Sequence, residues 1–290
     1  MILFYTCVII YSCLNMEYYV VYPQIIEGNL VDRIEDHNYM VELKYYKSED
    51  ESKFCCAGVI VSPWKILTVA HCVHNRTAFR LIFGTINVFA PLETVEITEK
   101  EVTIHPEYSG GVLLSNDIAV IQLNKPLVFN SKINQIKMVT DYYAAKAGDT
   151  VKMLGFTEGI GPNRTTTRSN LRYVESTITD FRTCHNSYWN HKMKRWVDEN
   201  TQICVDLRNR TINNTNRGDS GGPLITSDDP PKLLGLTSYD FKGLPEIFVK
   251  ISAYRTFISN PKGYKKGQTR KRESIDMKQS KFGRVSSERG

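Results

Sequence analysis

Short apolar runs separated by turn-forming segments constrain the fold of this 290-residue chain more than any other feature. Several runs alternate in side-chain character, as residues 118–123 do, and the segments between them are rich in Asn, Gly, Pro, Ser and Asp. Short strands at this spacing, with few helical periods, predict an all-β fold built as an antiparallel barrel or sandwich. The clearest runs are residues 59–61, 65–69, 118–123, 151–156, 233–237 and 247–251.

The hydrophobic content of 41% supports a real core rather than general disorder. One segment departs from the β-like pattern, because residues 253–260 place Tyr254, Phe257 and Ile258 at helical spacing. We therefore expect a short helix near the end of the folded region. No internal repeat is evident.

The formal net charge of +6 comes from the end of the chain. Residues 261–290 carry ten basic and three acidic residues, a net of +7, which leaves −1 for residues 1–260. A basic nucleic-acid-binding surface on the folded body is therefore disfavoured. The low apolar content of residues 261–290 predicts a disordered tail, which is a solvated appendage, a polyanion-binding segment or, at residues 270–272, a processing site.

The first 16 residues carry no charge and are mostly apolar, which favours a secretory signal peptide over a membrane anchor or a buried strand. We assign residues 1–24 to a signal peptide with a short propeptide and expect a secreted, extracellular protein without a membrane span. Four N-x-Ser/Thr sequences fit export as glycosylation sites, at Asn75, Asn163, Asn209 and Asn213. Removal of Cys7 and Cys13 leaves five cysteines, so one thiol lacks an intrachain partner.

Three short segments carry the chemistry: residues 68–72 (TVAHC), 115–120 (SNDIAV) and 218–223 (GDSGGP). A serine hydroxyl needs a neighbouring base to act as a nucleophile, and histidine supplies one near neutral pH. The imidazole in turn needs a buried acceptor that fixes its tautomer. Glycines beside the serine allow a sharp turn that aims backbone N–H groups at a developing oxyanion.

In their order and sequence these segments resemble the chymotrypsin-like (trypsin-fold) serine proteases, over residues 25–260. The resemblance implies two six-stranded antiparallel Greek-key β-barrels with the active site between them, followed by a short C-terminal helix. It implies that His71 is the general base, Asp117 its orienting carboxylate and Ser220 the nucleophile. The N–H groups of Gly218 and Ser220 would then form the oxyanion hole.

The same resemblance implies two disulfide bonds, Cys56–Cys72 and Cys184–Cys204, and leaves Cys55 as the odd cysteine. It also implies activation by cleavage before Ile25, whose new amine would pair with Asp219. Gln24 stands before Ile25, where a trypsin-like activator needs Lys or Arg. We therefore expect a non-tryptic activator or a chain that stays a zymogen.

The expected substrate-binding residues depart from the family pattern. Asn214 stands at the base of the pocket, where an aspartate would suit Lys or Arg substrates, and Asn216 replaces a common cysteine. The segment Ser238, Tyr239, Asp240 resembles the one that pairs with substrate backbone, with Asp240 in place of a glycine. Glu246 replaces another glycine on the pocket wall, where its carboxylate would attract a basic side chain, fill the pocket or pair with a lysine.

We therefore expect from this resemblance a secreted serine endopeptidase that forms an acyl-enzyme and is not trypsin-like in specificity. The alternative is a catalytically weak or silent homologue that acts as a secreted binding protein, because fold does not dictate function. We expect no metal or organic cofactor. The expected partners are protein or peptide substrates and protease inhibitors.

Overall fold

The computed structural model describes residues 28–46, 52–110, 114–140, 145–160, 166–191, 196–206, 219–241 and 243–267. Two predicted groups of residues lie outside this part: Ile25 with its preceding Gln24, and the sequon, pocket and oxyanion-hole positions Asn163, Asn209, Asn213, Asn214, Asn216 and Gly218. The predicted signal peptide and propeptide (residues 1–24), the side chain of Cys55 and residues 268–290 lie outside it as well.

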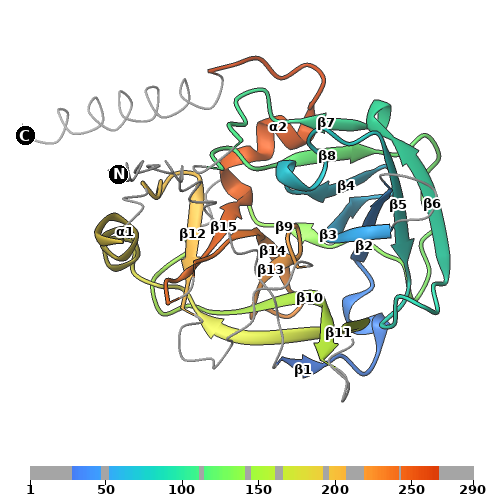
Figure 1. Ribbon diagram of the computed structural model, residues 1–290, viewed down its shortest axis with the longest axis horizontal. Coiled ribbons are helices and arrows are strands. Elements are labelled where there is room, and N and C mark those ends of the chain that lie inside the picture. The colour runs from blue at the N-terminus through green and yellow to red at the C-terminus, as the bar shows by residue number, and fades with distance from the viewer. Residues whose placement is uncertain are drawn as a thin grey trace, which may run out of the picture.

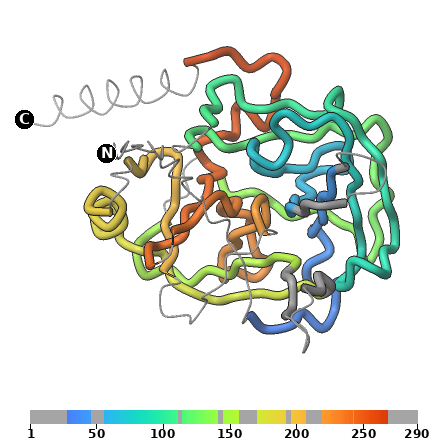
Figure 2. The backbone as a smooth tube through the Cα atoms, viewed as in Figure 1, coloured from blue at the N-terminus to red at the C-terminus, as the bar shows by residue number. Residues whose placement is uncertain are grey.

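Two mainly antiparallel sheets form the molecule and lie side by side, and apart from the short strands β1 and β9 the first comes from the first half of the chain and the second from the second half (Figures 1 and 2). The first sheet runs in the order β6-β5-β2-β3-β4-β8-β7. Its strands are β2 (Met40–Tyr46), β3 (Ser52–Ser62), β4 (Lys65–Thr68), β5 (Ala78–Phe83), β6 (Glu93–Thr98), β7 (Val102–Ile104) and β8 (Ala119–Gln122).

The first sheet closes into a barrel because its two edge strands follow each other along the chain. Only the 3-10 helix η3 (Glu99–Glu101) separates β6 from β7, and the Thr98 side chain and Glu101 form a capping box there. The two short strands are therefore one bent strand, and the seven segments make a six-stranded barrel, as predicted.

The second sheet runs β1-β11-β10-β13-β14-β15-β12, with β9 paired parallel to β14. A bridge between Ile178 and Val205 joins the end of β11 to β12 and closes six strands. Only the two-residue strands β1 and β9 lie outside this barrel. The bounds are β1 (Asn29–Leu30), β9 (Lys137–Met138), β10 (Thr150–Ile160), β11 (Thr166–Thr177), β12 (Gln202–Val205), β13 (Pro223–Thr226), β14 (Lys232–Tyr239) and β15 (Glu246–Lys250).

Helices are few and short, and in the described residues none has the length and apolar character that a membrane span requires. The predicted C-terminal helix is α2 (Arg255–Ser259), which follows the 3-10 helix η4 (Ile251–Tyr254). The sequence did not predict α1 (Phe181–Asn190), whose N-terminus is capped by the Asp180 side chain. The other 3-10 helices are η1 (Ile34–His37) and η2 (Ala70–Cys72).

Each end of the described chain crosses to the opposite barrel. The N-terminal strand β1 pairs with β11 of the second barrel. The C-terminal helix returns to the first barrel, near β7 and β8 (Figure 1), where Lys65 Nζ donates to the carbonyls of Ile258 and Ser259. The largest cluster of buried apolar residues contains side chains of both barrels, so the barrels share one core. This shared core fixes the relative positions of residues that the two barrels bring to their junction.

Candidate active site

His71 stands in η2, directly after the buried strand β4. The Cys56–Cys72 disulfide ties this turn to β3, as the resemblance implied. The backbone N–H of His71 donates to Asp117 Oδ1 at 2.9 Å, and its Nδ1 lies 2.8 Å from Asp117 Oδ2. Two contacts to one carboxylate fix both the backbone and the ring of the histidine.

Asp117 precedes β8 and is only 1% exposed. Besides His71, its Oδ2 accepts a hydrogen bond of 2.6 Å from the Ser238 hydroxyl, which comes from β14 of the other barrel. The sequence placed Ser238 beside the substrate backbone and did not reveal this second contact. Three donors from both barrels therefore surround a carboxylate that water does not reach.

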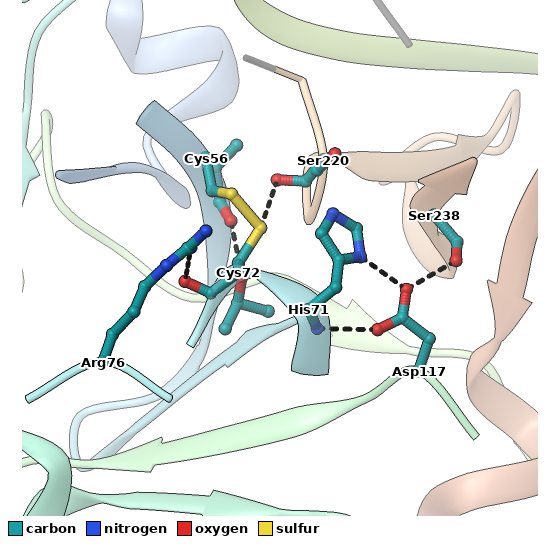
Figure 3. The surroundings of a disulfide bond; sticks show 9 residues. Cys56, His71, Cys72, Arg76, Asp117, Ser220 and Ser238 are labelled. Carbon is teal, nitrogen blue, oxygen red and sulfur yellow. Dashed lines mark hydrogen bonds and ion pairs between the residues drawn. A yellow bond between two sulfur atoms is a disulfide. The ribbon is translucent and has the colours of Figure 1, made fainter. Parts of the chain in front are cut away.

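Ser220 lies in the turn before β13, and Figure 3 shows the His71 imidazole between Ser220 and Asp117. The Ser220 carbonyl accepts a 2.8 Å hydrogen bond from the Ala57 N–H, which anchors the turn to β3. The next residue, Gly221, has φ +84°, and a Cβ there would stand 2.2 Å from the Ala57 carbonyl oxygen. Only glycine fits this position, so the glycine of the GDSGGP segment is needed to present the serine.

Asp219 is fully buried beside β10. A Cβ at Gly155 would lie 2.0 Å from Asp219 Oδ1, so Gly155 leaves the space that this carboxylate occupies. Sequence reasoning missed Gly155, because nothing in a strand pattern says which glycine a distant side chain approaches. Ile25, the expected partner of Asp219, lies outside the described residues.

A second group of acids lies near Asp219, at two of the positions expected to bind substrate. Glu246 on β15 is 4% exposed, and burial, followed by the charges of Asp240 and Asp219, raises its pKa well above the usual value. Burial raises the pKa of Asp240 to about 7. Crowded buried carboxyl groups hold protons that isolated ones would lose.

The remaining residues singled out by the sequence lie either in a buried core or on the surface. The side chain of Tyr239 is fully buried and packs against Tyr188 and Phe241, so it belongs to the core under β14. That core also contains the Cys184–Cys204 disulfide, which joins α1 to β12. The sequon residue Asn75 is exposed on the loop after η2.

One cluster in the described residues has the spacing of metal ligands. Donor atoms of Cys56, His71 and Cys72 lie within 4.8 Å of one another. Both sulfur atoms are consumed by the disulfide, however, and a thiolate is what binds metal. The cluster is therefore not a metal site.

Comparison with known proteins decides the family. The family model described as trypsin matches residues 25–258. The chain belongs to the trypsin family. Trypsin zeta of Drosophila erecta is 28% identical over 80% of this chain and 84% of its own length. Chymotrypsin-like elastase family member 1 of Bos taurus is 27% identical over 74% of this chain and 81% of its own.

The fold of this trypsin-family chain also has a match among solved structures. The one described as "Structure of GrC" has a TM-score of 0.68, covering 83% of this chain and all of that one. Its sequence identity is 22%, so this likeness concerns the fold. The two-barrel architecture is thus shared with a solved structure.

Proposed function

We propose that this trypsin-family protein is a secreted serine endopeptidase in which His71, Asp117 and Ser220 act as a catalytic triad. The observation that carries the proposal is the Asp117–His71 hydrogen bond of 2.8 Å, which joins a buried carboxylate to an imidazole beside Ser220 (Figure 3). A base oriented by a third group next to a serine is the arrangement that acyl transfer needs.

In this mechanism Ser220 Oγ attacks the carbonyl carbon of the scissile bond, and His71 Nε2 takes the hydroxyl proton. His71 returns that proton to the leaving amine as the C–N bond breaks and an acyl-enzyme remains. Water then attacks the ester with His71 again as base, and the acid product leaves as Ser220 regains its proton. Asp117 keeps Nδ1–H directed toward itself throughout, so Nε2 is the nitrogen that accepts.

The N–H groups of Gly218 and Ser220 would stabilise the oxyanion in each step. Their arrangement would depend on a cationic partner for the buried Asp219, supplied by the Ile25 amine after cleavage at Gln24. A buried carboxylate without such a partner is costly, which gives the cleavage its ordering effect.

The substrate preference we propose is not trypsin-like. Asn214 would offer no charge at the base of the pocket, and Asp240 and Glu246 would narrow the pocket with carboxyl groups. Burial raises the pKa values of both groups. A cleavage profile on a peptide library at pH 6 and pH 8 tests this preference, and dominant cleavage after Arg and Lys at both values would contradict it.

The decisive test of the function is Ser220→Ala in the secreted, processed protein. The variant should lose peptide hydrolysis and labelling by a serine-directed fluorophosphonate, with residual rates about 10⁶-fold lower. Ser227→Ala is the matched control, since the Ser227 hydroxyl is exposed and bonds to the Thr150 carbonyl. It should label like the wild type.

Two results would contradict the proposal. Labelling that persists in Ser220→Ala would remove Ser220 from the role of nucleophile. A folded, correctly processed wild type that does not label at all would favour the silent binding homologue. The basic tail, residues 261–290, is a separate proposal: deletion of residues 268–290, which keeps Tyr264 in place, should reduce retention on heparin if the tail binds polyanions.

A further inference from the structure

The loop that carries Asp117 is fastened by groups outside the triad. It starts at His105, whose N–H donates to the Ile118 carbonyl at 3.0 Å, so the two ends of the loop meet. Directly before Asp117, Asn116 has φ +52°. Residues other than glycine seldom adopt this left-handed conformation, and asparagine is among the few that tolerate it.

The Asn116 side chain forms hydrogen bonds in two directions. Its Nδ2 donates to the Glu107 carbonyl within the loop at 2.9 Å. Its Oδ1 accepts a hydrogen bond of 3.1 Å from the Tyr254 hydroxyl, which belongs to η4 and is separated from it by 138 positions in the sequence. Such bonds offset the cost of the unusual backbone and select one orientation for the residue that follows.

The Tyr254 ring is also fixed in place, by packing against other aromatic rings. Tyr254 is 2% exposed and contacts the His105 ring edge-on, with centroids 5.3 Å apart. His105 is 1% exposed and is also contacted by Phe257 of α2 and by Tyr264. Tyr264 lies within residues 261–290, the range that the sequence assigned to the tail. One aromatic cluster from the C-terminal segment therefore packs on the start of the loop and reaches its end.

We infer that Tyr254 is a positioning residue for the proposed triad, acting through Asn116 on the orientation of Asp117. This inference rests on the proposed function. The C-terminal segment, which contributes nothing to the triad itself, thereby takes part in setting the geometry of the Asp117–His71 pair. The path is short, because Asn116 and Asp117 are adjacent and the left-handed backbone between them has little freedom.

Tyr254→Phe tests the inference, because it removes the hydroxyl and keeps the ring packing. We expect kcat to fall about fivefold, the rate equivalent of one hydrogen bond of roughly 1 kcal/mol, with KM unchanged. A less firmly held Asp117 stabilises the imidazolium less, so the acidic limb of the pH–kcat/KM profile should move to lower pH. Tyr39→Phe is the matched control: Tyr39 is 4% exposed and its hydroxyl bonds to His37 Nδ1, away from the triad.

A second variant, Asn116→Gly, keeps the left-handed backbone accessible and removes both side-chain bonds. It should lower kcat at least as much as Tyr254→Phe, and the double variant should be no worse than Asn116→Gly because both act on one path. Additive losses in the double variant, or a Tyr254→Phe profile that matches Tyr39→Phe, would overturn the inference.

The two proposals fail in different ways. If the wild type neither hydrolyses peptides nor labels, the proposed function fails. The positioning role is then still measurable by proton NMR, through the signal of the proton between His71 and Asp117. This signal should change in Tyr254→Phe and stay unchanged in Tyr39→Phe. An active wild type with unchanged kcat, pH limb and proton signal in Tyr254→Phe removes only the positioning role.

Discussion

Asp117 and Glu246 are two buried carboxyl groups near the junction of the barrels, and their surroundings are opposite. Asp117 accepts hydrogen bonds from the His71 backbone, the His71 ring and the Ser238 hydroxyl. Glu246 has two other acids, Asp240 and Asp219, as its charged neighbours, and its Oε1 has no hydrogen-bond partner among the described residues. Both groups are almost fully buried, so their neighbours decide the difference in chemistry.

The role of a buried carboxyl group therefore depends on whether donors or other acids surround it. Three hydrogen-bond donors make Asp117 an acceptor with one orientation, suited to hold an imidazole. Two acidic neighbours, Asp240 and Asp219, favour the protonated form of Glu246, which suits this group to line a pocket or to bind a cation that enters it. Substitutions that remove one feature of one of these two sites at a time test this dependence.

Among substitutions at these two buried carboxyl groups and their neighbours, Asp117→Asn should have the largest effect. An amide in place of the carboxylate can donate to His71 Nδ1, which stabilises the wrong tautomer and leaves Nε2 protonated. The loss known for such triads is about 10⁴-fold in kcat. Steady-state kinetics with an active-site titration measures it. Asp32→Asn makes the same chemical change at an exposed position and should leave kcat unchanged. A loss below about tenfold would show that Asp117 does not orient the base.

The opposite outcome is expected for the acid cluster, where Asp240→Asn should stabilise the fold. The raised pKa of Asp240, about 7, means that the folded state keeps a proton that the unfolded chain loses near its ordinary value of 3.8. Wild-type stability therefore falls as pH rises from about 4 to 7 because of this group, and the variant escapes that loss. We expect the free energy of unfolding of Asp240→Asn to exceed that of the wild type by a few kcal/mol at pH 7.5, and the difference to disappear at pH 4.

Urea unfolding at both pH values measures this effect, with Asp32→Asn again as the control. Glu246→Gln should shift stability in the same direction, because burial and the neighbouring acids raise the pKa of Glu246 too. An increase in the free energy of unfolding that is the same at both pH values would contradict the view that these carboxyl groups resist ionisation.

The same contrast explains what the sequence could predict. The segments around His71, Asp117 and Ser220 are local signals, and the apolar runs overlap strands because alternation reports a buried face directly. Contacts between distant segments leave no such signal. The Ser238–Asp117 bond joins residues 121 positions apart in the sequence. Gly155, which leaves space for Asp219, lies on β10, and the strands β11 and β12 separate the two residues in the sequence. The helix α1 did have a local cue in Asp180, whose side chain accepts from the Thr183 N–H.

The smallest effect is expected for Ser238→Ala, which removes one of the three donors from Asp117. The two bonds from His71 remain, so the carboxylate keeps its main partner and loses only the contact from the second barrel. We expect kcat to fall about fivefold, as for a single hydrogen bond, with KM unchanged because the backbone of β14 is intact. Ser227→Ala is the control for loss of a hydroxyl. A rise in KM instead would place the Ser238 side chain at the substrate, and a loss approaching that of Asp117→Asn would mean that the barrels hold Asp117 mainly through Ser238.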